Sequence, residues 1–326
     1  MRDSDRLLLC SPIGGLNDTL CQIEKCRRYA KAYDRTLITD TVRTGLMGHF
    51  TDYFEFSDCD EKIIPWVSAD CIEALNALDC RPPEIAGRFG KYVPRWAGCG
   101  KNHVDQLTGA QLSFDFACDH PEPLLVHSQS GGGSYSQSLL SHIRFSAPVA
   151  RAITDALRDI EPGYVGIHIR HTDHQTDYKM FLAALAPRLI RKRVLICTDN
   201  RDVRSYAMDA LKCSYPFFVT ELPDQAGKAL HVSKNYTSDD DRRQATVNAF
   251  TDLVALGMAD AVHFTTVSAG WPSGFSSLAK FLSENQSVLT SLLGQSDLSG
   301  LPARRTARRY GRIMRGLRIA RDALHI

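Results

Sequence analysis

Short apolar runs that break into polar turns recur along this chain, and they predict the strands of parallel sheets. The clearest run is Val165–Ile169, which is rich in β-branched residues and is followed at once by Arg170 and Asp173. A strand that is apolar on both faces is typical of a sheet covered by helices on both sides. The other strands that we predict are Leu7–Cys10, Thr36–Thr39, Leu124–His127, Val194–Cys197 and Ala261–Phe264.

Helical periodicity separates these strands. After the first strand, apolar residues at Leu20, Ile23, Tyr29 and Tyr33 predict a helix. Further helices are expected at residues 149–160, 178–190 and 244–256, whereas residues 80–115 lack periodicity and predict loops and short helices. Strands that alternate with helices in this way indicate an α/β fold with parallel sheets.

The length of 326 residues suits two domains rather than one. We place the boundary near residue 148, which gives an N-terminal domain of 1–148, a C-terminal domain of 149–300 and a basic helix of 301–326. The apolar runs fall short of the roughly 20 residues that cross a bilayer. Because Met1–Arg6 lacks the apolar core of a signal peptide, we expect the chain to be cytoplasmic.

The ten cysteines are scattered singly with no CxxC pair, which predicts reduced and mostly buried thiols. The run Asp239–Asp241 has two interpretations, a metal site or a solvated turn that complements the dipole of the next helix. Consecutive side chains rarely face one ion together, so we favour the turn and expect no metal.

Charge is unevenly distributed along the chain. Residues 301–326 hold eight arginines and one aspartate, which gives this segment a formal charge of +7. Since the whole chain has a net charge of +2, residues 1–300 carry −5. An acidic body argues against a nucleic-acid-binding protein. The segment also has an apolar stripe at Ile313, Leu317, Ala320 and Leu324. It predicts peripheral contact with the anionic inner face of a membrane or, alternatively, a helix that packs across the domains.

Polar side chains follow three predicted strands of the C-terminal half. They are His168 with Arg170, Thr198 with Asp199, and the serine-rich stretch from Ser268 through Ser273 to Ser276. The carboxyl ends of parallel strands share one edge of a sheet, where open α/β sheets bind ligands. An arginine and the amides of a helix beginning near Ser276 both suit an anion. This pattern predicts a ligand that carries phosphate.

The N-terminal half has a glycine loop, Gly14-Gly15-Leu16-Asn17, between its first strand and first helix. The loop is not a GxGxxG sequence and has no Walker lysine, so it supports neither a dinucleotide nor an ATPase site. Two interpretations stay open, a loop whose backbone amides approach a ligand or a tight turn in which Asn17 caps the helix.

Taken together, these motifs resemble those of the GDP-fucose-dependent fucosyltransferases, a clan that comprises α1,6-fucosyltransferases, a rhizobial nodulation enzyme and protein O-fucosyltransferases. The HxRxxD motif of the clan matches residues 168–173, although His171 stands where the α1,6 enzymes usually have a second arginine. Further similar segments are Gly14–Asn17, His49–Phe54, Thr198-Asp199, Asp252, Leu256–Asp260 and Ser273–Ser276.

The resemblance implies a GT-B-like fold, in which two Rossmann-type parallel-sheet domains face a central cleft with the acceptor on the N-terminal side. It implies an inverting transfer of fucose or a related sugar from a GDP-sugar to a glycan or glycolipid, in polysaccharide biosynthesis and without a metal or other cofactor. Arg170 would neutralise the leaving phosphate, and Asp177 or its competitor Asp173 would be the base. The implied nucleotide-sugar-binding residues are Gly14, Gly15, Asn17, His168, Thr198, Asp199, Asp252, Ser268, Ser273 and Ser276.

Two alternatives stay open at this point. The donor could be another nucleotide sugar, because an arginine that contacts phosphate does not read the sugar or the base. The chain could also be a catalytically inactive protein that binds a nucleotide sugar or a glycan. The sequence does not identify the acceptor or the linkage formed.

Overall fold

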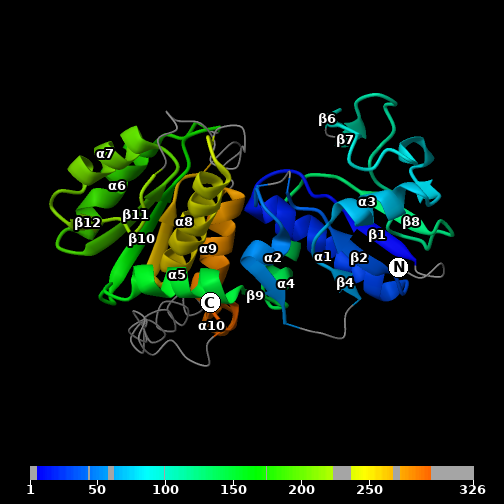
Figure 1. Cartoon of the computed structure of the whole chain (residues 1–326). Helices are drawn as coiled ribbons and strands as arrows, with labels where there is room; N and C mark the ends of the chain where they lie inside the picture. The colour runs from blue at the N-terminus through cyan, green and yellow to red at the C-terminus, as the bar shows by residue number, and fades with distance from the viewer. Residues whose placement is uncertain are drawn as a thin grey trace, which may run out of the picture.

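The computed structural model forms two α/β halves that lie side by side (Figure 1). It describes residues 6–42, 45–57, 62–98, 100–173, 175–222, 236–266 and 272–294. Ser268 and the basic segment 301–326 lie outside the described residues, so the role of that serine and the membrane contact of that segment stay predictions.

The N-terminal half is built on a parallel sheet of five strands in the order β4-β2-β1-β8-β5. The central strand, β1, is buried along its whole length. Its side chains alternate between two cores, so that Leu8 faces helix α1 and Leu9 faces helix α3. The elements are β1 Leu7–Cys10, α1 Leu16–Ala32, β2 Thr36–Thr39, β4 Ile63–Ile64, α3 Ala69–Asn76, β5 Cys80–Arg81 and β8 Leu124–His127.

Short elements complete this half, and several of them were not predicted. They are α2 Phe50–Tyr53, β3 Phe54–Phe56, the 3-10 helix Pro83–Ile85, β6 Pro94–Trp96, β7 His103–Asp105, α4 Tyr135–Leu139 and β9 Ile143–Phe145. Residues 80–115 therefore contain three short strands where only loops and short helices were expected. Strands of two or three residues are too short to produce the alternation on which a prediction depends.

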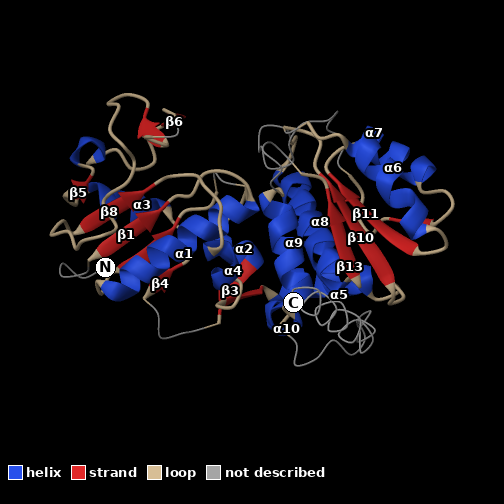
Figure 2. Cartoon of the chain, turned by 180° about the vertical axis from the view of Figure 1, so that it is seen from behind, coloured by secondary structure: helices blue, strands red, loops and turns tan. Residues whose placement is uncertain are grey.

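The C-terminal half has a parallel sheet of four strands in the order β12-β11-β10-β13. Figures 1 and 2 show α6 and α7 on one face of this sheet and α8 and α9 on the other. The predicted strand at 165–169 is the buried β10. The elements are α5 Ala147–Leu157, β10 Tyr164–Ile169, α6 Tyr178–Leu189, β11 Arg193–Thr198, α7 Arg201–Ala210, β12 Tyr215–Phe217, α8 Asp239–Met258, β13 Ala261–Phe264, α9 Gly274–Glu284 and α10 Gln286–Leu292.

The two sheets repeat one topology. In each, the first strand of the half lies between the second strand and a later one, so β1 separates β2 from β8 and β10 separates β11 from β13. The crevice beside such a reversal of strand order is where open α/β sheets bind ligands. The halves share one hydrophobic core, in which Tyr53 and Phe54 pack against Phe250 of α8. Phe50, Tyr53 and Phe54 of the aromatic segment 49–54 are thus part of this core.

Two further predictions concern the thiols and the aspartate run. All eight described cysteines are free, and five of them are buried. Asp239–Asp241 form the first turn of α8, capped by Ser238, as expected for a turn that complements a helix dipole. None of the helices in the described ranges has the length and apolar character that a membrane-spanning helix needs.

Candidate active site

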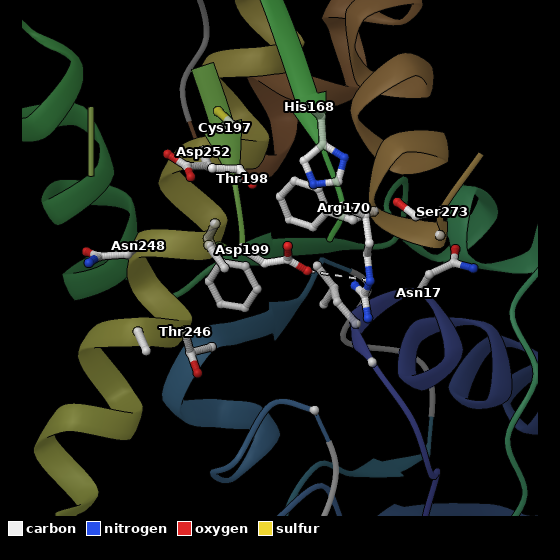
Figure 3. A pocket seen from close by; sticks show the side chains of 18 of the residues that line it. Asn17, His168, Arg170, Cys197, Thr198, Asp199, Thr246, Asn248, Asp252 and Ser273 are labelled. Atoms are coloured by element: carbon white, nitrogen blue, oxygen red, sulfur yellow. Dashed lines mark ion pairs between the residues drawn. The ribbon is translucent and has the colours of Figure 1, made fainter. Parts of the chain in front are cut away.

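A cavity of about 410 Å³ lies where the two halves meet. Figure 3 shows side chains from both halves pointing into it, including Asn17, Arg170 and Asp252. It brings together most of the site residues predicted from sequence, namely Gly14, Gly15, Asn17, His168, Arg170, Asp173, Thr198, Asp199, Asp252 and Ser273. Ser276 and Asp177 do not line it, and Ser268 lies outside the described residues.

Arg170 follows β10 and projects into the middle of the cavity (Figure 3). Its guanidinium donates to both carboxylate oxygens of Asp173, at 2.8 and 2.6 Å, and its Nε lies 3.6 Å from Asp199 Oδ2. Among the described lining residues Arg170 is the one arginine or lysine. The carboxylates that line the cavity are Asp18, Asp173, Asp199, Glu221 and Asp252. Any anionic ligand therefore depends strongly on Arg170.

Asp199 organises the turn that carries Arg170. From the end of β11, its carboxylate accepts the backbone N–H of His171 at 2.8 Å and the hydroxyl of Thr172 at 2.7 Å. The parallel register of the strands makes this contact possible, because Ile169 pairs with Thr198. Asp199 thus fixes the direction in which the guanidinium leaves the sheet.

His168 is buried at the end of β10, and Ser276 supports it from α9. The two side chains are 2.7 Å apart, between Nδ1 and Oγ, and Ser276 Oγ is 2.9 Å from Ser273 Oγ. Burial, with the charge of Arg170 as a smaller cause, lowers the pKa of His168 to about 3. The imidazole is therefore neutral at physiological pH, and its role is to hydrogen-bond rather than to pair with charge. Ser276 therefore acts on the cavity indirectly, by holding His168 in place.

The N-terminus of α9 forms one wall of the cavity. Ser273 caps the helix by accepting the N–H of Ser276, and Gly274 and Phe275 of the first turn also line the cavity. The first N–H groups of a helix have no partner within it, and the helix dipole favours an anion there. Arg170 and this helix terminus therefore offer two sources of positive potential to one ligand.

Asn17 joins the two halves at this wall. It does not cap α1, whose N-cap is Gly15 without a side-chain hydrogen bond. Its Oδ1 instead accepts the hydroxyl of Ser136 at 2.6 Å. A Cβ added at Gly274 would lie 2.6 Å from Asn17 Cβ, and one added at Gly132 would also collide with the amide. The cap interpretation is wrong, because Gly15 is the N-cap and Asn17 lies within the first turn of α1.

Asp252 of α8 lies at the opposite end of the cavity, close to Thr198 and Cys197 (Figure 3). Its carboxylate accepts the hydroxyl of Thr220 at 2.9 Å. Burial is the main influence on this group and raises its pKa to about 7, although Thr220 and the charge of Arg204 act in the opposite direction. A carboxylate with two acceptor oxygens in a buried slot can receive a pair of N–H donors from a planar ligand.

Asp177 is not where the predicted base would be expected. It is the N-cap of α6, and its side chain accepts the N–H of Met180 at 3.0 Å. Asp173 lines the cavity, whereas Asp177 is not among the described residues that line it.

Several lining residues were missed by sequence reasoning. Thr220 and Glu221 follow the short edge strand β12, in a segment without a motif, and Asn248 is one polar position on a long helix. Gly45 could have been identified from the sequence, because it begins a stretch that contains two glycines, Gly45 and Gly48. Its N–H donates to Gly14 O at 2.8 Å, and a Cβ there would lie 2.6 Å from that oxygen.

Comparison with known proteins gives a likeness of fold. No protein-family model matches the sequence, and no curated protein matches it either. A structure of the fucosyltransferase NodZ from Bradyrhizobium aligns with a TM-score of 0.56 and 18% identity, over 86% of this chain and 93% of that chain. NodZ α-1,6-fucosyltransferase co-crystallised with GDP aligns with 0.56 and 16%, and the protein soaked with GDP-fucose with 0.56 and 17%; both alignments cover the same shares.

These values confirm the predicted GT-B-like fold of two parallel-sheet domains that face a central cleft. At this level of sequence identity the likeness shows a shared fold and not a shared function. The assignment of chemistry depends on the side chains in the cavity.

Proposed function

We propose that this chain is an inverting glycosyltransferase that moves fucose or a related deoxyhexose from a GDP-sugar to a glycan or glycolipid. The observation that carries the proposal is the arrangement of one cavity, with Arg170 projecting into it, the α9 N-terminus at one wall and a buried carboxylate, Asp252, at the opposite end. Solved structures of the same fold include NodZ with GDP and NodZ soaked with GDP-fucose, which supports the choice of donor.

The donor diphosphate would lie between Arg170 and the first turn of α9. A guanidinium is a planar fork that suits phosphate oxygens, and the free N–H groups at Gly274 and Phe275 add donors from the other side. His168, held by Ser276, supplies a neutral ring nitrogen to the nucleotide. These groups provide the charge compensation for which other transferases use a metal ion.

The guanine would occupy the slot that ends at Asp252. Guanine presents an N1–H and an exocyclic amine on one edge, and a carboxylate can accept both together. Uracil and cytosine do not present this pair of donors. We therefore assign base selection to Asp252, with Thr220 fixing the direction of the carboxylate.

In the transfer step, the bond between the anomeric carbon and the β-phosphate oxygen breaks while the acceptor oxygen attacks from the opposite face. The electron pair leaves with GDP, and the acceptor proton passes to a carboxylate. Arg170 and the helix terminus lower the barrier by stabilising the charge that grows on the phosphate. A positioned base contributes further by removing the proton.

We assign the base to Asp173 in preference to Asp177. Asp173 lines the cavity, whereas Asp177 caps α6. In the free protein the carboxylate of Asp173 is held by Arg170. A donor phosphate would compete for the same guanidinium and leave Asp173 available to the acceptor hydroxyl.

The test is GDP release from a panel of nucleotide sugars, in the presence and absence of glycan acceptors. We expect GDP-fucose or another GDP-deoxyhexose to be consumed only when an acceptor is present, and the product anomer to be inverted. Thermal shifts with GDP, UDP and CMP give an independent readout of the base, because a ligand stabilises the state that it binds. Stronger stabilisation by UDP would replace the donor assignment, and GDP binding without turnover would favour a binding protein.

A further inference from the structure

A second hollow, of about 280 Å³, opens in the N-terminal half at the carboxyl ends of β1 and β2. It lies on the face of the sheet opposite to α1, since its walls belong to the core that contains Leu9, Leu75 and Phe89. Asp40, which follows β2, is the one charged residue among the described residues that line it. The hollow is therefore an apolar site with a single acidic group at the edge of the sheet.

The walls of this hollow are held in place by polar contacts behind them. Asn76 at the end of α3 accepts the N–H of Phe89 at 2.8 Å, and Arg88 donates to Asp105 of β7 at 2.7 Å. Gly90 has a positive φ of 80°, and its missing side chain leaves space beside Ile72. A cavity whose walls are fixed before binding loses little entropy when a ligand enters.

Part of the apolar lining of the hollow is open to solvent. Val42 lines the hollow and is 40% exposed. An apolar hollow whose lining reaches the surface is typical of a binding site.

The hollow and the central cavity open at the same carboxyl edge of the N-terminal sheet. Leu9 near the end of β1 and Asp40 after β2 line the hollow, and Gly14, which follows β1, lines the cavity. Asp40 is fixed to β1, because its N–H donates to Cys10 O at 2.8 Å and Ser11 donates to its carboxylate at 3.2 Å. A molecule seated in the hollow thus lies at the sheet edge that also carries the N-terminal wall of the active site.

We propose that this hollow binds an uncharged apolar group of the acceptor, an alkyl chain or an aromatic ring attached to the sugar that is modified. The inference rests on the proposed function, which needs an acceptor on the N-terminal side of the cavity. The volume fits this class, because a cavity of about 150 Å³ lined by aliphatic and aromatic side chains already holds benzene. Asp40 is suited to accept a hydroxyl of the sugar next to that group.

The test measures binding of methyl, phenyl and hexyl β-glucoside by calorimetry, below micelle-forming concentrations. With wild-type protein we expect affinity to rise about fourfold for each methylene group that enters the hollow. The phenyl and hexyl compounds distinguish an aromatic from an alkyl group.

Two variants locate the effect. Val42→Asp places a charge at the edge of the hollow, and we expect it to weaken the hexyl compound about tenfold while GDP binding is unchanged. Val67→Trp should block the hollow by filling it. Leu107→Asp is the matched control, because Leu107 is 77% exposed in the same half and does not line the hollow.

The inference is overturned if chain length has no effect on wild-type affinity, or if Leu107→Asp weakens binding as much as Val42→Asp. Either result leaves GDP binding and turnover untouched, so the proposed function would survive. Absence of GDP binding to the wild type would instead overturn the proposed function, while the chain-length selectivity of the hollow could still be measured.

Discussion

The two halves of this protein share a sheet topology but differ in what their strand ends carry. In the C-terminal half, β10 and β11 are followed directly by Arg170 and Asp199, which contact each other at the reversal of strand order. In the N-terminal half, β1 ends in a glycine loop, and its neighbour β2 ends beside an apolar hollow. One half thus concentrates charge, and the other offers backbone and apolar surface.

The difference indicates a division of labour. Charged groups at fixed positions suit a ligand with invariant phosphates, whereas glycine and apolar walls suit a partner that is recognised by shape. If this is correct, substitutions in the C-terminal half should change donor binding and turnover, and those in the N-terminal half should act on acceptor binding and stability.

The largest effect is expected from Arg170→Ala. Removal of this guanidinium leaves the five carboxylates of the cavity without a described arginine or lysine, so turnover should fall by about 10³-fold. GDP release measures the loss, and circular dichroism checks the fold. Arg151→Ala, at an exposed position of α5, is the matched control. Turnover near the wild-type rate in the Arg170 variant would remove the basis of the mechanism.

The second effect separates the two candidate bases. Asp173→Asn should lower kcat by about 10²-fold, because the proton acceptor is lost from the cavity. Asp177→Asn should retain most activity, since asparagine caps helices as well as aspartate does. Steady-state kinetics of both variants across pH give the comparison, and the reverse order of losses would return the role to Asp177.

Asp252 makes donor binding depend on pH. Because burial raises its pKa to about 7 and guanine needs the ionised form, GDP should bind about tenfold more weakly at pH 6 than at pH 8. Asp252→Asn should bind GDP weakly at both pH values, as measured by calorimetry. A wild-type affinity that does not change over this range would contradict the assignment.

The same group affects stability in a direction that can be calculated. An ordinary aspartate loses its proton near pH 3.8, and Asp252 in the folded protein keeps it to about pH 7. The folded state therefore binds more protons in this window, so the free energy of unfolding falls as pH rises from about 4 to 7. Urea titrations should show a smaller decrease in Asp252→Asn.

The smallest effect tests the N-terminal half. A Cβ at Gly45 would lie 2.6 Å from Gly14 O and 2.8 Å from Gly15 Cα, both backbone atoms, so Gly45→Ala should reduce the free energy of unfolding by about 1–3 kcal/mol. Gly15→Ala meets no atom within 4 Å and has a negative φ, so it should cost less than about 1 kcal/mol. Equal losses in the two variants would show that the close approach at Gly45 is unimportant.

The predictability of the fold followed the strength of local patterns. The apolar runs of β1, β8, β10 and β11 were located to within a residue, because a buried parallel strand leaves a continuous signal. Strands β5, β6 and β7 were missed because they are too short to alternate. The site residues differed in predictability for the same reason. Arg170 and Asp199 could be predicted because they directly follow strands with a clear apolar pattern. Thr220 and Asn248 reach the cavity only through tertiary packing, which no local pattern records.

Asn17 has a consequence for how sequences of this kind can change. Its amide occupies space that side chains at Gly132 and Gly274 would otherwise fill, and these three positions come from three separate segments. A larger residue at either glycine is compatible with the fold only if position 17 becomes smaller at the same time. The three positions should therefore covary among homologous sequences, so that a pair of substitutions is tolerated where each single one is rejected.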